Sequence, residues 1–274
     1  MIKHYLKVAF RNLMKYKMQS FVSIIGLAVG FTCFALSALW IRYEMTYDNF
    51  HKGSDRIYMV RAHYANEPGT SNFTPYPLME YLQDKMPEIE AVTAFTPHHV
   101  KFRLEETEQE VGMIDADSVF MNFFDIQLLK GTVNFLKSDG QEVAITKEFA
   151  KRLFSKEEDA LGKEVEVGRR VCKIGAIVSG WSNHSNIPYN ILAPARHSPR
   201  WGSSNEQLFI RVRERTDIDA FRTKMSTIRI NDIEKESELS DLLITRMSAL
   251  RYSDYVDKAD VVISFSYIFY LFIS

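Results

Sequence analysis

The feature that most constrains this chain is an uncharged stretch at residues 20–41, which reads SFVSIIGLAVGFTCFALSALWI. As an α-helix, these 22 residues would extend about 33 Å, and the apolar core of a bilayer is about 30 Å thick. Eleven of them are Leu, Ile, Val or Phe, and aromatic residues lie near both ends, as in a membrane-spanning helix. A cleaved signal peptide is the main alternative, although its apolar region would have only about 7–15 residues. We therefore predict a transmembrane helix over residues 20–41.

The leader before this stretch, residues 1–19, is basic and contains no Asp or Glu. Because Lys and Arg flank spanning helices on the cytoplasmic side, the leader predicts a cytoplasmic N-terminus and an external location for the rest of the chain. An apolar stripe runs beside the charges, which indicates an amphipathic helix lying on the inner leaflet in contact with membrane lipid. The alternative is a disordered basic flank that only sets topology. The residues expected to set topology and contact the interface are Lys3, Lys7, Arg11, Lys15 and Lys17.

Two glycines in the predicted helix, Gly26 and Gly30, form a G-x-x-x-G pattern. Small residues at this spacing let two spanning helices approach closely. We interpret them as a packing face against other membrane spans, without inferring a dimer from one match.

The charge balance excludes one broad class of function. The chain has 34 Lys and Arg residues and 35 Asp and Glu residues, a net charge of -1. A nucleic-acid binder whose affinity rests on a large basic excess is therefore not expected. There are two cysteines, Cys33 in the apolar stretch and Cys172 in a predicted strand, so the chain is not a disulfide scaffold.

Residues 42–260 alternate between strand-like and helix-like segments, which predicts an α+β fold with a two-lobed external domain of mixed α/β structure. The predicted strands are 57–64, 91–95, 100–104, 111–114, 142–145, 165–167, 171–178, 207–212 and 242–247. The predicted helices begin at Pro77, Asp117, Lys147 and Ile218. Residues 42–50 are expected to continue the spanning helix as a stalk, and residues 180–205 to form a loop or a connection between lobes.

The last 14 residues, 261–274, are uncharged again. As a helix they would extend only about 21 Å, which is too short to cross a bilayer. We predict the start of a second transmembrane helix here, with a buried C-terminal strand as the alternative.

No residue constellation points to catalysis. The sequence has no G-x-x-x-x-G-K-[ST] loop for ATP and no G-x-S-x-G nucleophile motif. The histidines at 98, 99, 184 and 197 lack the spacing of a metal site. We therefore predict a non-enzymatic protein with no cofactor, no metal and no catalytic residue.

Two weaker predictions concern the external domain. The aromatic residues Phe120, Phe123 and Phe124, with Phe135, would line a cleft for an apolar substrate or, as is more common for such side chains, form part of the core. Asp48 and Arg56 would form a salt bridge coupling the stalk to one lobe, although an exposed pair contributes under about 1 kcal/mol.

Several segments, in this order, resemble the N-terminal part of the permease subunits of MacB-like and FtsX-like ABC transporters, most closely those of Bacteroides-type bacteria. MIKHYLKVAFRNLMKYK and SFVSIIGLAVGF look like the family's basic elbow and first spanning helix. YDNFHKGSDRIYMVR, beginning at Tyr47, looks like the start of its external domain. DADSVFMNFFDIQLLKG, VAITKEFAKRLF and ALGKEVEV look like the core of its periplasmic domain. The similarity extends from residue 1 to about residue 250.

The resemblance implies a location, partners and a mechanism. The protein would lie in the bacterial inner membrane with its main domain in the periplasm. A partner ATPase in the cytoplasm would close on ATP, and the stalk would transmit that motion to the periplasmic domain for export or release of a substrate. A second permease copy or homologue is implied, with a periplasmic adaptor as an optional further partner. The family usually has four spans, so this chain departs from the pattern and corresponds to an N-terminal fragment.

Two other classes remain as alternatives. Two spans around an external α+β domain are also the layout of a membrane-anchored sensor or ligand-binding module. An anchored periplasmic enzyme would share the architecture, but no residue constellation supports it.

Overall fold

The computed structural model describes residues 2–65, 69–154, 156–181, 184–230 and 239–252. It divides into two compact units, Met1–Thr46 and Tyr47–Ser274. The predicted second transmembrane helix, residues 261–274, lies outside the described residues.

The first unit consists of two helices, α1 (Ile2–Lys15) and α2 (Lys17–Glu44). They are separated at Tyr16, whose φ of -110° and ψ of 57° are not helical. α2 is long and apolar enough to cross a membrane by length and composition, and none of its most apolar window is buried inside the structure. Among the described residues, apolar side chains of α2 such as Leu27, Phe31 and Phe34 are at least 70% exposed.

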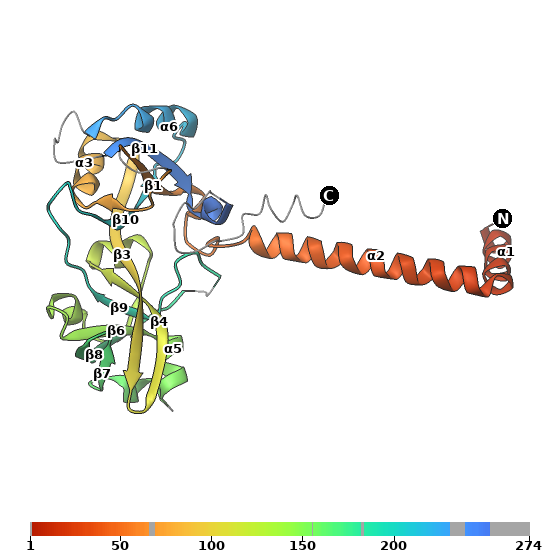
Figure 1. The fold of residues 1–274 in the computed structure, drawn as a ribbon, viewed down its shortest axis with the longest axis horizontal. Coiled ribbons are helices and arrows are strands. Elements are labelled where there is room, and N and C mark those ends of the chain that lie inside the picture. Colours follow the sequence, from red (N-terminus) through yellow and green to blue (C-terminus); the bar gives the residue numbers. More distant parts are fainter. Residues whose placement is uncertain (1, 66–68, 155, 182–183, 231–238, 253–274) are drawn as a thin grey trace. The chain divides into compact units, whose positions relative to one another are not determined.

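The second unit contains two lobes, and the first is built on an antiparallel sheet in the order β11-β1-β10-β3 (Figure 1). Its strands are β1 (Ile57–Tyr64), β2 (Thr74–Pro75, beside β10), β3 (Ile89–Leu104), β10 (Ser204–Val212) and β11 (Leu239–Arg246). Helices α3 (Pro77–Lys85) and α6 (Ile218–Ser226) bury Leu78, Leu82 and Phe221 in one core cluster with Tyr58 and Val60 of β1. Both helices thus contribute to the core on one face of the sheet.

The other face of this sheet is also buried. Ile57 and Met59 of β1 alternate with Tyr58 and Val60, and they belong to a second core cluster that includes side chains from the other lobe. A strand that is buried on both faces has a continuous apolar run, which explains the sequence IYMV at the start of β1.

The second lobe is a closed ring of six strands. Its pairing runs β3-β4-β9-β6-β8-β7 and returns to β3 through the pairs Phe102–Val167 and Arg103–Glu166. The strands other than β3 are β4 (Thr107–Ala116), β6 (Glu142–Thr146), β7 (Glu164–Val167), β8 (Arg170–Val178) and β9 (Ile191–Pro194). A further strand, β5 (Leu128–Gly131), pairs with the C-terminal part of β8, beyond its pairing with β7. Its helices are α4 (Ser118–Phe123) and α5 (Lys147–Leu153), with the 3-10 turns η2 (Val133–Lys137) and η3 (Glu157–Ala160). The 3-10 turns η1 (Ser54–Arg56), before β1, and η5 (Met247–Tyr252), after β11, belong to the first lobe.

The two lobes share one strand. β3 pairs with β10 up to Phe95 and with β4 from Thr96 onwards, and Figure 1 shows it extending through both lobes. The sequence predicted two separate strands here, 91–95 and 100–104. That prediction is wrong: Pro97 has no N–H to donate, and it lies next to the residues where β3 changes partner, so the strand continues.

The predicted loop between residues 180 and 205 contains a strand, β9, that the sequence did not predict. β9 is only four residues long and pairs in parallel with β4 and antiparallel with β6. Its first two residues, Ile191 and Leu192, are fully buried. A strand this short has no detectable periodicity, and its pairing partners are distant in sequence. β5 escaped prediction for the same reason.

Gly131 offers a test of the packing between β5 and β8. Its φ is +82°, and a Cβ at this position would collide with the carbonyl oxygen of Gly175 and lie 2.8 Å from Ala176 Cα. Gly162 has a similar φ of +77° with no atom within 4 Å of the place that a Cβ would occupy, so it is a matched control for backbone strain alone. We expect Gly162→Ala to cost about 1 kcal/mol and Gly131→Ala at least about 3 kcal/mol. Chemical denaturation measures both, and equal losses would contradict the packing described.

Candidate functional site

The candidate site is the segment that joins α2 to the second unit, which we call the connecting segment (Tyr47–Arg56). The prediction that helix continues through residues 42–50 is wrong beyond Glu44, because α2 ends there and residues 45–50 form turns. The connecting segment contains two residues with positive φ, Asp48 at 57° and Gly53 at 70°. Asp tolerates this left-handed conformation better than most residues with a Cβ, which is a local reason for its presence.

Asp48 anchors the connecting segment to the loop before β9. Its side chain is fully buried and accepts hydrogen bonds from Ser185 Oγ at 2.5 Å, Asn186 Nδ2 at 2.6 Å and the Asn186 amide at 3.1 Å. Its own amide donates to the carbonyl of His184 at 3.2 Å. Burial raises the pKa of Asp48, while the hydrogen bonds from Ser185 and Asn186 act in the opposite direction. A carboxylate is thus held in the interior by donors 137 and 138 residues away in sequence.

Arg56, at the other end of the connecting segment, does not pair with Asp48, so the predicted salt bridge is wrong. Its guanidinium instead contacts Glu90 Oε2 at 2.5 Å and donates to the carbonyl of Val212 at 2.9 Å. Asp48 is satisfied by neutral donors, and Arg56 connects the segment to the first lobe. Sequence proximity did not identify the partners because all of them are distant in the chain.

An aromatic cluster surrounds the middle of the connecting segment. The ring centroid of His51 lies 4.8 Å from that of Trp181 and 5.1 Å from that of Phe124. Trp181 Nε1 donates to the Ile187 carbonyl at 2.9 Å. Burial, with a contribution from the charge of Arg211, lowers the pKa of His51 to about 4, so this imidazole is neutral at physiological pH. The connecting segment, the loop before β9 and α4 therefore form one packed unit.

The three phenylalanines predicted from the sequence lie in this region. Phe120, Phe123 and Phe124 are 0%, 3% and 7% exposed and belong to the core cluster between the lobes. Asp117 caps α4 by accepting from the Phe120 amide at 2.8 Å, which fixes the helix that presents them. Arg211 of β10 donates to the Phe123 carbonyl at 2.5 Å. These positions agree with the core alternative, and none of the three lines a described pocket.

The residues predicted at the membrane lie on the two helices of the first unit. Arg11 and Lys15 of α1 and Lys17 of α2 have exposed side chains, and Lys3 and Lys7 are on α1. Gly26 and Gly30 lie on α2 with no atom within 4 Å of the position where a Cβ would be. Topology and helix packing at these residues stay predictions.

A second contact, which the sequence did not predict, lies between the lobes at His197. Its ring stacks on Tyr76 at 3.9 Å, and its two nitrogens lie 3.7 Å from Asp117 Oδ2 and from Glu206 Oε1. Both distances exceed a hydrogen bond, so these are charge interactions. Burial alone would lower the pKa of His197, but the two carboxylates outweigh it and raise the pKa to about 9. The imidazolium thus links α4 of the second lobe to β10 of the first.

Among the residues that the structure describes, no group of three or more His, Cys, Asp or Glu side chains could hold a metal ion. Cys172 is buried and Cys33 is exposed on α2, and both are free thiols. At the candidate site, hydrogen bonds and aromatic packing attach the connecting segment to the loop before β9 and to α4.

Fold and site together define a mixed α+β domain that follows an apolar helix in the chain. A family model described as the MacB-like periplasmic core domain matches residues 20–228. The chain belongs to this family, and hence to the MacB-like permeases of ABC transporters. No curated protein matches the chain in sequence.

Solved structures with the same fold include three domains of permease or transporter proteins. A domain of a permease protein from Porphyromonas gingivalis has a TM-score of 0.58 at 19% identity, covering 72% of this chain and 92% of its own. The extracellular domain of the noncanonic ABC-type transporter YknZ from Gram-positive bacteria has a TM-score of 0.50 at 15% identity, covering 69% and 99%. The periplasmic region of MacB from Actinobacillus actinomycetemcomitans has a TM-score of 0.51 at 12% identity, covering 72% and 92%. These similarities support the fold.

Replacement of Asp48 tests the anchor. In Asp48→Ala the hydroxyl and amide donors of residues 185 and 186 lose their buried acceptor, and Ala is strained at positive φ, so we expect a loss of about 3 kcal/mol. Asp48→Asn keeps an acceptor and tolerates the backbone, so we expect about 1 kcal/mol. Asp125→Ala, at an exposed position with φ of 52°, controls for backbone strain. Equal destabilisation by Asp48→Ala and Asp125→Ala in urea denaturation would show that Asp48 is not an anchor.

The raised pKa of His197 predicts that the free energy of unfolding depends on pH. Because its pKa of about 9 in the folded state exceeds its usual value of 6.5, its stabilisation is complete below pH 6.5 and is lost as pH rises through 9. The free energy of unfolding of the wild type should exceed that of His197→Gln by about 3 kcal/mol at pH 6, and the gap should close near pH 10. Denaturant titrations at both pH values measure it. A gap that does not change with pH would mean that the imidazolium does not interact with the two carboxylates.

Proposed function

We propose that this chain is the first transmembrane helix and the periplasmic domain of a permease subunit that couples ATP hydrolysis by a separate cytoplasmic ATPase to a conformational change in the periplasm. Export or release of a substrate on that side would be the outcome. The observation that carries the proposal is the match of 209 residues, 20–228, to the MacB-like periplasmic core domain, in a chain whose α2 has the length and composition of a spanning helix.

The proposed domain organisation uses the segment boundaries expected from the sequence. Residues 1–19 would be a cytoplasmic amphipathic leader, 20–41 the membrane-embedded part of α2, 42–260 the periplasmic domain and 261–274 the start of a second transmembrane helix. The excess of Lys and Arg in the leader supports a cytoplasmic N-terminus. The inner membrane would then be the site of action, with Lys3, Lys7, Arg11, Lys15 and Lys17 at its cytoplasmic surface.

Coupling would require that a displacement of the spanning helix reaches the domain. Along the chain, only three residues separate the end of α2 at Glu44 from the buried Asp48. Asp48 is bonded to the loop before β9, and His51 packs in the aromatic cluster. A short connection that ends in a rigid anchor transmits force better than a long flexible one, because a flexible chain absorbs displacement as entropy.

The chemistry of hydrolysis would reside in the partner ATPase. The sequence has no P-loop motif, so this subunit would be non-catalytic. A second permease copy or a homologue would complete the transporter, with Gly26 and Gly30 in the helix packing face. A periplasmic adaptor is a further proposed partner. The three phenylalanines at 120, 123 and 124 would support the domain from its core.

The test uses cells that express the permease containing this chain together with the ABC ATPase encoded beside its gene. The proposal predicts co-purification of the two proteins. In a Cys33→Ser/Cys172→Ser background, it also predicts that Lys173→Cys reacts with a membrane-impermeant maleimide before lysis, whereas Lys15→Cys reacts only after lysis. The exposed side chains of Lys15 and Lys173 make both positions suitable. The proposal fails if the ATPase does not co-purify or if Lys173→Cys is labelled only after lysis.

A further inference from the structure

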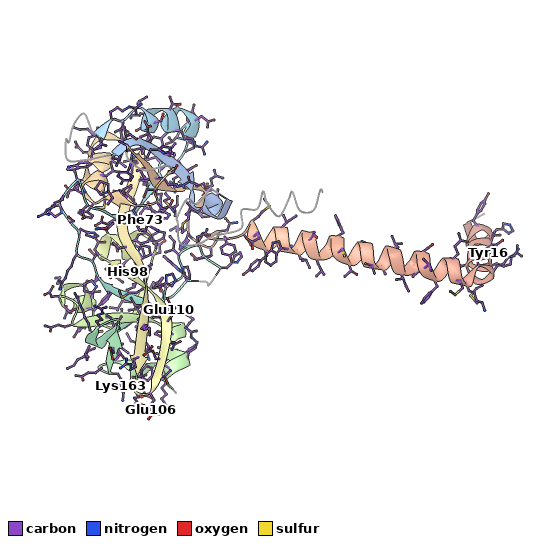
Figure 2. The ribbon with its side chains drawn as sticks, viewed as in Figure 1. Tyr16, Phe73, His98, Glu106, Glu110 and Lys163 are labelled. Atoms are coloured by element: carbon purple, nitrogen blue, oxygen red, sulfur yellow. The ribbon has the colours of Figure 1, made fainter. Side chains whose placement is uncertain are left out.

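A cavity of about 340 Å³ opens at one end of the six-strand ring. Asp115 and Pro194 lie at the C-terminal ends of β4 and β9, and Gly140, Val143 and Arg170 lie at or just before the N-terminal ends of β6 and β8. Because β4 and β9 run parallel to each other and antiparallel to β6, all of these ends meet at the same mouth of the ring. Figure 2 shows His98, which also lines the cavity, far along the β3–β4 hairpin from Glu106 at its tip.

The inner wall of the cavity is apolar. Alternate residues of the ring strands face a common core that includes Phe102, Ile145 and Ile174. At the mouth this core is incomplete, and the cavity is lined there by Met113, Val143, Val167, Cys172, Ala193 and Pro194. Mouths of β-barrels are common ligand sites because side chains from the strands do not fill them.

The rim of the cavity is cationic. It carries Arg169, Arg170 and Arg196, against a single lining carboxylate, Asp115. Asp115 is already paired with His98 Nε2 at 2.9 Å, which raises the pKa of His98 through the hydrogen bond.

Arg196 also has a partner: its guanidinium contacts the Asp139 side chain and donates to the Asp139 carbonyl at 2.7 Å. Arg169 and Arg170 have no ion pair among the described residues. Two guanidinium groups are therefore unneutralised beside an apolar cavity.

Gly140 leaves room for one of these groups. Its φ is +83°, and a Cβ at this position would lie 3.2 Å from Arg170 Nη1. The guanidinium of Arg170 thus lies close to Gly140 at the rim of the cavity, where the residue is exposed and accessible to a ligand.

We propose that this mouth binds a small amphipathic organic anion, with its apolar part against Met113, Val143 and Ala193 and its carboxylate or phosphate on Arg169 and Arg170. Guanidinium groups bind such anions by charge-assisted, often bidentate hydrogen bonds. The volume lies at the lower end of the range for ligand sites, about 300–1,000 Å³, which favours a small molecule. The site does not depend on ATP coupling, so it extends the proposed function and can be tested separately.

The test is photo-crosslinking of the chain in nanodiscs with a diazirine derivative of decanoic acid, followed by peptide mass spectrometry. We expect cross-links at the strands that line the cavity, competed by excess decanoate or decyl phosphate and at least ten-fold less well by decanol, which has the same chain without the charge. Inorganic phosphate should not compete, because it lacks the apolar part. If only decanoate or only decyl phosphate competes, the result still supports the site and shows whether it prefers a carboxylate or a phosphate headgroup.

The variant Arg169→Gln/Arg170→Gln removes both free guanidinium groups from exposed positions at the start of β8, and circular dichroism checks that it folds. We expect at least a ten-fold loss of cross-linking at the cavity. Lys163→Gln/Lys173→Gln, with the same change of charge at exposed positions outside the cavity lining, should retain it. Equal losses in both variants, equal competition by decanol, or cross-links confined to α1 and α2 would each overturn the proposal.

Discussion

The periplasmic domain depends on the apolar core between its two lobes. Phe95 of β3 stacks on Phe209 of β10 at 5.5 Å and meets Phe120 of α4 edge to face at 4.9 Å. Met59 and Met247 contribute from the first lobe, so the sheet there is buried on both faces. Removing one large aromatic residue from such a core costs about 3–5 kcal/mol. This core and the shared strand β3 both extend across the boundary between the lobes. Separating the lobes would therefore require unfolding this core.

The connecting segment is attached to the same core. His51 contacts Phe124 and Trp181, and Asp48 is hydrogen-bonded to the loop that follows Trp181. The segment that follows the spanning helix is therefore joined to the region where the lobes meet, and not to the surface of one lobe. That attachment is what a permease would need if helix motion moves the whole domain. Arg211 and His197 add polar contacts across the same boundary.

The sequence correctly predicted those helices and strands that local sequence patterns determine. The helix from Pro77 and the strands 57–64, 165–167 and 171–178 all appear, because capping, alternation and turn residues lie within a few positions of one another. It did not predict β9, the continuity of β3 through Pro97, or the partners of Asp48 and Arg56. These depend on residues up to 156 positions apart, for which one sequence carries no local signal. The sequence also did not predict the cavity at the mouth of the ring. Its lining residues come from several strands, and their order in the sheet cannot be derived from the sequence.

Hydrogen exchange along β3 tests most directly whether the two lobes form one body. If they do, the amides of Val92 and Ala94, in the first lobe, and of Val100 and Phe102, in the second, will exchange with the same free energy of opening and respond equally to denaturant. Opening of the second-lobe amides at a much lower free energy than those of the first lobe would contradict it, because the lobes would then unfold separately.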